Sequence, residues 1–519
     1  MQVIEDTLVL RTRNPDQIQS SIPDSHVLQV NKDIYTMAIK GWDLPTAQKL
    51  TKLNMKRVPS PIMHDYVWGG IHPPMDHQKT TAEFLTLNPR AFCFNEQGTG
   101  KTAACIFAAD YLLEQGYINR VLIICPLSIM KSAWQSDFFK FAPHRSVGVA
   151  HGTKEKRIKV VEGGYEFIVI NYDGIDVIKE TVAKGGFDLI IIDEANAYKN
   201  ATTKRWKVVN KYLMGPSTWL WMLTGTPAAQ SPIDAHGLAK LCVPENVTPS
   251  KTRFKDSVMY QVSRFIFVPK PNAEDIVFNT LQPAIRYTKE ECLDLPEITY
   301  TSRETPLTPQ QKYYYHQLKE EFIMEADEEL VISKNAAVNF SKLLQVSGGC
   351  VYANSGSTIE FDISNRLRVV KEVIDEATAK VLVFAPFKHT IAVIEEYLNK
   401  EGISTECIDG GVSLNKRTDI IQRFQTLSDP RVLIIQPAAA AHGVTLTAAN
   451  TVIWYSPITS VEHYLQANAR VNRKGQKNAM TVVNLSGSGV EQKLYGMLSG
   501  KLENHVKILD LYNEFIREK

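Results

Sequence analysis

Two stretches of the chain alternate short apolar runs with segments of helical periodicity. In the first stretch, the apolar runs cover residues 91–94, 121–125, 167–170, 189–192 and 219–223. In the second stretch, the candidate strands are residues 381–384, 405–408, 432–435, 451–454 and 481–485. Short apolar runs between helical segments are typical of parallel strands that are covered on both faces. The pattern therefore predicts an α/β protein with two parallel-sheet lobes.

The segments around these stretches have a different character. The N-terminal part combines short strands, such as residues 26–30, with one helix near residues 44–53. Between the stretches, the chain is more polar and rich in helical patterns, with Thr308 as N-cap and Pro309 as first residue of a helix. Residues 502–515 have helical spacing, which predicts a helix that packs back on a lobe. We expect four segments: an N-terminal accessory segment at 1–70, a first lobe at 71–245, a helical insertion and connector at 246–366, and a second lobe with a C-terminal helix at 367–519.

Composition narrows the class of protein. A chain of 519 residues with 44% hydrophobic content exceeds a single ordinary core, which favours two or three domains. The 58 basic and 56 acidic residues nearly balance, so net charge neither supports nor excludes a polyanion partner. The seven cysteines include no Cys-x-x-Cys pair and have no histidine at zinc-ligand spacing. With no apolar run of membrane-spanning length either, we expect a cytoplasmic protein without zinc or a membrane partner.

A glycine-containing loop follows the first apolar run. Residues 95–102 read Asn-Glu-Gln-Gly-Thr-Gly-Lys-Thr, and a helical sequence comes directly after them. Glycines let backbone N–H groups approach phosphate oxygens, while the lysine reaches the terminal phosphates and the last threonine can bind Mg²⁺. Asn95 replaces the first glycine of the strict motif, so a chance Gly-Lys-Thr is the alternative. The order of strand, loop and helix predicts a site for ATP and Mg²⁺, with loop contacts from Gln97, Gly98, Thr99, Gly100, Lys101 and Thr102.

Two adjacent carboxylates end the apolar run at 189–192. The sequence Asp193-Glu194-Ala195-Asn196 falls at the carboxyl end of a predicted parallel strand, where such sheets bind ligands. Asp193 is placed to hold Mg²⁺ through water, and Glu194 to orient or deprotonate an attacking water. A solvated strand-end acid pair is the alternative. The phosphate loop upstream on the same sheet favours the catalytic interpretation.

These motifs, in this order, resemble helicase superfamily 2 and within it the Swi/Snf-like branch. Residues 95–102 are similar to that branch's Asp-Glu-Met-Gly-Leu-Gly-Lys-Thr, which also lacks the first glycine. Residues 193–196 resemble its DEAH box, with Asn196 in place of histidine, and Lys199-Asn200 matches the pair that follows the box. Residues 466–476 resemble motif VI. The resemblance covers nearly all of the chain after residue 70, and it implies two RecA-like lobes in a compact member of bacterial or phage type.

The resemblance also implies roles for individual residues. Gln78 corresponds to the glutamine that reads adenine, and Gln466 belongs to the nucleotide-binding frame of motif VI. Arg470 and Arg473 correspond to arginine fingers, and their spacing predicts one helical turn between them on one helix face. A solvated basic face is the alternative for that pair alone. Four segments resemble further motifs of the branch: residues 125–128 with Trp134 (motif Ia), 171–173 (motif Ib), 223–227 (motif III) and 443–450 (motif V). They imply nucleic-acid contacts by Ser128, Trp134, Tyr172, Thr224, Thr226 and Thr447.

Two further groups of residues have both a functional and a structural interpretation. Lys199, Lys204, Arg205 and Lys207 could extend a nucleic-acid track, although charges on a helix face are usually just solvated. The three tyrosines at residues 313–315 could stack on bases. A helix with three adjacent aromatic residues is nevertheless expected to pack at least one of them into a core.

The resemblance implies an ATP-dependent translocase that moves on nucleic acid, and the expected substrate is double-stranded DNA. Closing and opening of two lobes around ATP would move one backbone grip relative to the other. Such grips carry no base readout, so movement should be insensitive to sequence and sensitive to salt. The uses of such motors include remodelling of DNA structures or DNA-protein complexes in replication, recombination or repair. The alternatives are a strand-separating DNA or RNA helicase, an ATP-regulated nucleic-acid-binding switch or scaffold, and the motor subunit of a nuclease complex.

Overall fold

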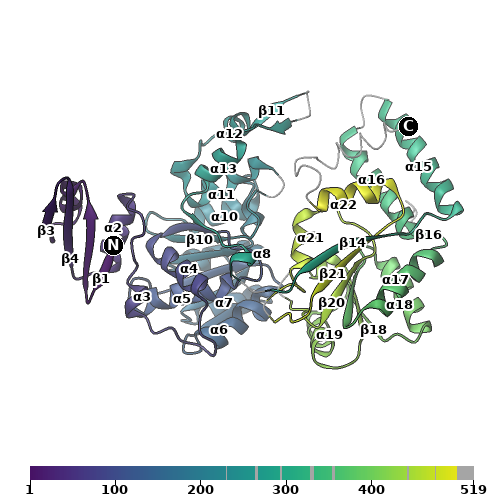
Figure 1. Ribbon diagram of the computed structural model, residues 1–519, viewed down its shortest axis with the longest axis horizontal. Coiled ribbons are helices and arrows are strands. Elements are labelled where there is room, and N and C mark those ends of the chain that lie inside the picture. Colours follow the sequence, from purple (N-terminus) through teal and green to yellow (C-terminus); the bar gives the residue numbers. More distant parts are fainter. Residues whose placement is uncertain are drawn as a thin grey trace. The chain divides into compact units, whose positions relative to one another are not determined.

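The computed structural model describes residues 1–228, 231–262, 267–292, 295–327, 332–352, 357–440, 444–473 and 475–499. The chain divides into two compact units, Met1–Cys292 and Leu293–Lys519 (Figure 1). The helix predicted at residues 502–515 lies outside the described residues, as does Gly443 of the segment similar to motif V. Within the described part, no helix combines the length and apolarity needed to cross a membrane.

The N-terminal accessory segment is an antiparallel sheet with three helices. Its strands follow the order β1-β2-β4-β3, and its elements are β1 (Gln2–Ile4), β2 (Thr7–Thr12), α1 (Pro15–Ser21), β3 (Ser25–Asn31), β4 (Ile34–Lys40), α2 (Leu44–Lys52) and α3 (Ile62–Asp65). The predicted strand at 26–30 lies in β3, and the predicted helix near 44–53 is α2. Leu8 and Met37 belong to the same buried cluster as Ile106 and Phe107 of the first lobe. Accessory segment and first lobe thus share one core.

The first lobe is built on a seven-stranded parallel sheet of order β13-β5-β10-β9-β6-β8-β7. Its strands are β5 (Arg90–Cys93), β6 (Val121–Cys125), β7 (Val147–Ala150), β8 (Phe167–Asn171), β9 (Leu189–Asp193), β10 (Trp219–Leu223) and β13 (Ala284–Ile285). Leu189 and Ile191 of β9 enter one buried cluster, while Ile190 and Ile192 enter the cluster on the opposite face. Burial on both faces explains why the sequence of a central strand is continuously apolar.

Helices cover both faces of this sheet and fill the segments after it. They are α4 (Asp76–Leu87), α5 (Lys101–Glu114), η1 (Met130–Gln135), α6 (Ser136–Phe141), α7 (Lys154–Glu162), α8 (Tyr172–Val177), α9 (Lys179–Ala183), η2 (Ala195–Tyr198), α10 (Lys204–Tyr212), η3 (Pro232–Asp234), α11 (Ala235–Cys242), η4 (Pro244–Asn246), α12 (Lys251–Val258), α13 (Ala273–Thr280) and α14 (Lys289–Cys292). One of them, η1, is a π-helix. A contact with the accessory segment fixes α5, because the Tyr66 hydroxyl donates to the buried carboxylate of Asp110.

The second lobe is built on a six-stranded parallel sheet of order β14-β21-β20-β17-β19-β18. Its strands are β14 (Ile298–Glu304), β17 (Lys380–Phe384), β18 (Thr405–Ile408), β19 (Val432–Ile435), β20 (Ala449–Trp454) and β21 (Met480–Ser486). Its helices are α15 (Pro309–Asp327), α16 (Ile332–Gly348), α17 (Ser364–Glu376), α18 (Lys388–Lys400), α19 (Leu414–Thr426), α20 (Pro437–Ala440), α21 (Val461–Asn468) and α22 (Gly489–Leu498). The predicted class, α/β with two parallel-sheet lobes, is confirmed.

The stretch at residues 246–366 contains strands as well as helices. β13 extends the first sheet and β14 lies at the edge of the second. Two short antiparallel pairs, β11 (Met259–Gln261) with β12 (Phe267–Pro269) and β15 (Cys350–Tyr352) with β16 (Thr358–Glu360), complete it. The sequence pattern did not predict β13 and β14, because β13 has only two residues and β14 is largely exposed. As predicted, a helix begins at Pro309, and one of its three tyrosines, Tyr315, lies in the core.

A buried ion pair joins five elements of the second lobe. Arg366 of α17 bonds to the Glu491 carboxylate of α22 at 2.7 Å, and both side chains are at most 2% exposed. The same guanidinium donates to the carbonyl oxygens of Ser347 in α16, Tyr455 after β20 and Leu485 in β21. A charge removed from water is retained here because nearly every donor has a partner.

Removal of one partner of this pair should destabilise the second lobe strongly. Arg366→Met leaves the Glu491 carboxylate buried without its cation, and we expect a loss of about 3–5 kcal/mol in the free energy of unfolding. Urea unfolding measures it, with Arg368→Met on the same helix as control, since Arg368 is 71% exposed and forms only a surface pair. Equal stability of the two variants would contradict the importance of the buried pair.

Candidate functional site

The phosphate loop connects the end of β5 to the first turn of α5. Gly98 and Gly100 have φ values of 90° and 81°, in the left-handed region that favours glycine. The Lys101 ammonium donates to the carbonyl oxygens of Asn95 at 2.7 Å and Glu96 at 3.2 Å. Loop backbone and lysine thus surround the N-terminus of a 14-residue helix. Phosphate groups bind to such an arrangement.

Two side chains hold this loop in place, Asn95 and His77, and the sequence did not single out His77. A His77 ring nitrogen lies 2.7 Å from the Thr99 carbonyl oxygen. The Asn95 amide donates to the Thr81 hydroxyl at 2.9 Å and accepts from the backbone N–H of Tyr287 at 3.0 Å. The departure from the glycine motif at Asn95 therefore has a structural reason, because this side chain bridges α4 and the segment after β13.

The predicted adenine-reading residue, Gln78, lies against the loop. Its amide oxygen accepts from the Met75 backbone N–H at 2.9 Å, and its amide nitrogen donates to the Gly100 carbonyl at 3.3 Å. A Cβ atom at position 100 would collide with the Gln78 amide, which adds a second reason for glycine there. The structure thus places Gln78 beside the phosphate loop.

The acid pair lies at the end of β9, close to the same loop. One Asp193 carboxylate oxygen accepts from the Glu194 backbone N–H at 2.9 Å. Glu194 has φ of 49°, a left-handed conformation that costs free energy in a residue other than glycine. Its carboxylate accepts from the side-chain amide of Gln97 at 3.2 Å, so the loop and the acid pair adjoin. The other polar atom of that amide, Gln97 Oε1, is buried and has no hydrogen-bond partner among the described residues.

Two of the residues expected to contact nucleic acid, Trp134 and Thr224, have fully buried side chains. Their part in nucleic-acid binding stays a prediction. The Trp134 indole lies on the inner side of η1, near Phe138. Thr224 follows the central strand β10, where its N–H donates to Cys93 and its hydroxyl accepts from the Thr226 backbone. The motif sequences alone do not show that these two side chains point into the core.

The other expected contact residues are partly exposed: Ser128, Tyr172, Thr226 and Thr447. The Tyr172 hydroxyl is already engaged, because it donates to the carbonyl oxygens of Asp193 at 2.7 Å and Glu194 at 3.2 Å. Burial and the charges of the acid pair raise the pKa of Tyr172 well above its ordinary value. The hydroxyl therefore stays protonated and remains a donor.

Asn196 links the acid pair to the Thr-Gly-Thr segment after β10. Its amide donates to the Thr226 carbonyl oxygen at 3.0 Å and lies 3.4 Å from the Thr226 hydroxyl. The amide that replaces the family's histidine thus makes a hydrogen bond toward that segment. It connects two strand ends of one sheet.

The basic residues near the acid pair are largely matched with acids. Lys199 pairs with Asp234 at 3.2 Å, Lys204 with Asp176 at 2.6 Å, and Arg205 with Asp173 at 3.4 Å. Exposed pairs of this kind contribute little to stability. They also lower the local excess of positive charge that a nucleic-acid track needs.

The motif VI residues lie at and beyond the end of α21. Gln466 is buried within this helix, and its amide donates to the Glu462 carboxylate at 3.2 Å. The predicted placement of Arg470 and Arg473 on one helix face is wrong, because α21 ends at Asn468; Arg470 follows in a turn and Arg473 in a bend. The Asn468 side chain accepts from the indole of Trp454 at 3.0 Å, and this fixes the helix end on β20.

A glutamine that follows the arginines braces the motif V segment. Gln476 donates to the carbonyl oxygens of Thr447 at 3.3 Å and Ala449 at 2.8 Å. The Thr447 hydroxyl in turn accepts from the Gln425 amide at 3.3 Å. Arg473 donates to the Val444 carbonyl at 3.3 Å, so motifs V and VI form one network in the second lobe.

Comparison with known proteins decides the family. The model of the SNF2-related domain matches residues 77–348, and that of the helicase conserved C-terminal domain matches residues 365–475. The chain belongs to the SNF2-related family. It therefore carries the two domains of a helicase-type ATPase, as the motif order predicted.

Individual relatives of this SNF2-related chain share about a quarter of its residues. An uncharacterized ATP-dependent helicase of Mycoplasma genitalium is 26% identical over 79% of this chain and 39% of its own length. The chromodomain-helicase-DNA-binding protein 1-like of Mus musculus is 26% identical over 79% of this chain and 46% of its own length. The chain thus spans less than half the length of these two relatives. The solved Sulfolobus solfataricus SWI2/SNF2 ATPase core in complex with dsDNA is 23% identical, covers 87% of this chain and 97% of its own, and has a TM-score of 0.42.

The SNF2-related domain offers a donor set that fits Mg²⁺ with ATP. Thr102 supplies a hydroxyl in the first turn of α5, and Asp193 supplies a carboxylate at the end of β9, next to Glu194, which contacts the loop. Mg²⁺ commonly takes one or two such protein oxygens together with substrate phosphates and water. Among the described residues, no cluster of three or more His, Cys, Asp or Glu side chains could hold a metal ion by itself.

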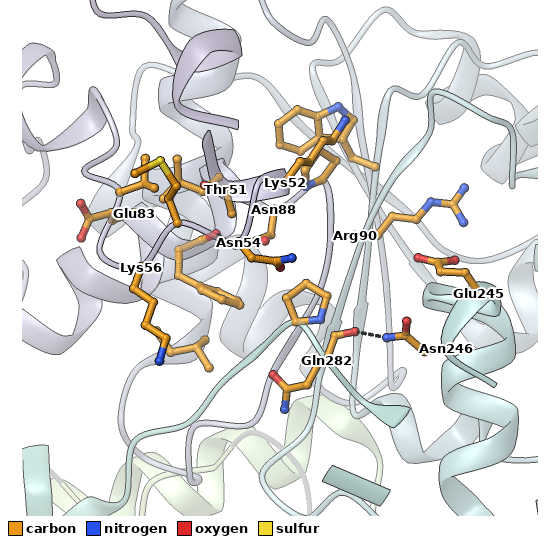
Figure 2. Close-up of a pocket in the computed structure, with 18 of the residues that line it drawn as sticks. Thr51, Lys52, Asn54, Lys56, Glu83, Asn88, Arg90, Glu245, Asn246 and Gln282 are labelled. Atoms are coloured by element: carbon orange, nitrogen blue, oxygen red, sulfur yellow. Dashed lines mark hydrogen bonds between the residues drawn. The ribbon is translucent and has the colours of Figure 1, made fainter. Parts of the chain in front are cut away.

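A separate cavity of about 1200 Å³ opens where the accessory segment meets the first lobe (Figure 2). Its walls include Arg90 and Trp219, which are the first residues of β5 and β10. On one side, the Asn246 amide donates to the Gln282 carbonyl at 2.6 Å (Figure 2). Because the phosphate loop and Asp193 follow the opposite ends of these parallel strands, this cavity is not the nucleotide site.

Proposed function

We propose that this SNF2-related chain is a nucleic-acid-stimulated ATPase that translocates on double-stranded DNA. The observation that carries the proposal is the meeting of phosphate loop and acid pair at one sheet edge, where Gln97 of the loop contacts Glu194. Nucleotide binding and water activation require these two elements side by side. The names of the relatives, ATP-dependent helicase and DNA-binding protein, support the same class.

In this proposal each part of the site has one task. Lys101 and the loop backbone bind the ATP phosphates, while Thr102 and Asp193 hold Mg²⁺, which neutralises phosphate charge when it is bound. Glu194 orients and deprotonates the attacking water. Arg470 and Arg473 stabilise the charge of the transferred phosphoryl group, for which the two lobes must close around ATP.

Repeated closure then supplies movement along DNA. Each lobe grips the phosphate backbone, through the partly exposed Ser128 on the first and Thr447 on the second, so closure shifts one grip relative to the other. We further propose that the motor remodels DNA structures or DNA-protein complexes in replication, recombination or repair. The resemblance to the Swi/Snf-like branch supports this use.

The test is the ATP hydrolysis rate without nucleic acid and with single-stranded DNA, duplex DNA or duplex RNA. We expect the strongest stimulation with duplex DNA, and a loss of stimulation between low and moderate salt, because backbone contacts release counterions. Lys101→Ala is the control for contaminating ATPases. Stimulation mainly by single strands would favour a strand-separating helicase, and no stimulation would favour an ATP-regulated switch.

A further inference from the structure

Two aromatic side chains from different segments donate hydrogen bonds to the acid pair. The Trp134 indole N–H of η1 donates to a carboxylate oxygen of Asp193 at 3.0 Å. The Tyr172 hydroxyl, at the start of α8, donates to the backbone oxygens of Asp193 and Glu194. These segments follow the neighbouring strands β6 and β8, whose carboxyl ends lie at the same sheet edge. The acid pair is therefore held from two sides, by an indole N–H and by a phenol hydroxyl.

The contact from Trp134 determines how the Asp193 carboxylate is oriented. One carboxylate oxygen accepts from the Glu194 backbone and the other accepts from the indole, so both oxygens have a fixed donor. Asp193 is only 8% exposed, and hydrogen bonds to a buried carboxylate are strong and depend steeply on geometry. A small displacement of the indole would thus turn the carboxylate.

The π-helix η1, which carries Trp134, has one buried side and one exposed side. Trp134 and Met130 are buried, whereas Lys131 and Ser132 are exposed on the same short element. The element is a π-helix, a conformation that is rare and occurs frequently at functional sites. A ligand that binds the exposed side therefore acts on a segment whose buried side touches Asp193.

The contact from Tyr172 acts on the backbone of the acid pair. Glu194 keeps its left-handed conformation, which costs free energy, only while its surroundings hold it. The Tyr172 hydroxyl donates to the carbonyl oxygen of Asp193, which precedes Glu194, and to the carbonyl oxygen of Glu194 itself. A shift of α8 would change the backbone that aims the Glu194 carboxylate.

We propose that Trp134 and Tyr172 are positioning residues that couple nucleic-acid binding at η1 and α8 to the orientation of Asp193 and Glu194. This inference rests on the proposed nucleic-acid-stimulated ATPase. Neither side chain touches the reacting atoms. Each transmits a displacement of its own segment to one member of the acid pair.

The test uses Trp134→Phe, which removes the indole N–H, and Tyr172→Phe, which removes only the hydroxyl. Two matched controls are available in the same lobe. Trp221 is also fully buried, but its indole donates to Asn88 at the other edge of the sheet. Tyr198 is buried, and its hydroxyl has no hydrogen-bond partner among the described residues. Trp221→Phe therefore repeats the first change at the other end of the strands. Tyr198→Phe removes a hydroxyl beside the Tyr172 ring that bonds to neither member of the acid pair.

The decisive measurement is an equilibrium coupling. The affinity for a short DNA duplex is measured with and without a non-hydrolysable ATP analogue and Mg²⁺, and the ratio of the two affinities gives the coupling factor. We expect Trp134→Phe to reduce the coupling factor and the duplex-stimulated rate relative to the basal rate by about tenfold, as loss of one hydrogen bond to a charged group predicts. Tyr172→Phe should reduce both by about threefold to fivefold, the effect of a neutral hydrogen bond. The two controls should leave both ratios unchanged.

Each outcome has a distinct meaning. If the unaltered protein shows coupling and both variants keep it within about twofold, the positioning role is overturned while the proposed function stands. If the unaltered protein shows neither coupling nor stimulation, the proposed function fails and the positioning role fails with it. If Trp134→Phe does not fold, as thermal unfolding will show, the result with Tyr172→Phe decides. A fall in the basal and stimulated rates by the same factor would also contradict the coupling.

Discussion

Replacing Arg470 or Arg473 by alanine is expected to lower the rate of ATP hydrolysis by about three to five orders of magnitude. Each guanidinium is expected to stabilise the charge on the phosphoryl group during transfer, and no other described part of motif VI brings a fixed cation. Nucleotide binding should persist, because Lys101 and the phosphate loop belong to the first unit. Single-turnover hydrolysis together with binding of a fluorescent ATP analogue measures the two effects separately.

A matched control separates this effect from damage to the second lobe. Arg368 lies on α17 in the same lobe and is exposed, so Arg368→Ala should hydrolyse ATP normally. Equal loss of nucleotide binding and hydrolysis in the Arg470 and Arg473 variants would indicate misfolding. Retained hydrolysis with retained folding would remove both residues from the mechanism. Lysine is not expected to restore activity, because it lacks the planar fork of donors.

Glu194→Gln is expected to lower the turnover number by about two to four orders of magnitude. The amide keeps the size of the side chain and can still accept the hydrogen bond from Gln97, but it cannot take a proton from water. The affinity for ATP should therefore change little. Steady-state hydrolysis with saturating duplex DNA measures turnover, and equilibrium binding of the ATP analogue measures affinity.

The control for this variant is the same substitution at Glu162, an exposed carboxylate in α7. Glu162→Gln should leave turnover unchanged. Normal turnover in Glu194→Gln would show that another group activates the water. In that case, the left-handed backbone of Glu194 would need a different explanation.

The sequence predicted those parts of the fold that local burial determines. Nine of the ten expected strands lie within strands of the two sheets, and the range 91–94 extends one residue past β5. Most of them are covered on both faces, and such a strand must be apolar throughout. β13 was missed because it has two residues, and β7 because only two of its four positions are buried. β14 was missed because its exposed positions give it no apolar run. Pairing at a sheet edge depends on distant residues, which a local pattern does not contain.

The site was predictable to the extent that one motif forms one local structure. The loop around Lys101 and the strand end at Asp193 have the expected geometry, since strand, loop and helix follow each other directly. The inward position of Trp134 and the end of α21 before Arg470 were not predictable. The position of Trp134 depends on a π-helical turn. The end of α21 depends on a hydrogen bond from Trp454, which lies in β20 and is distant from Arg470 in the local pattern.

The core shared by the accessory segment and the first lobe limits how this protein can be rearranged. The helix α5, which begins with Lys101, packs its buried side into a cluster that also contains Leu8 and Met37, and Tyr66 bonds to its Asp110. Exchange of the first 70 residues for those of a relative would therefore leave mismatched surfaces behind the nucleotide-binding helix. The exposed positions of the accessory sheet, such as those of β3, can change freely, but its inner face must change in step with α5.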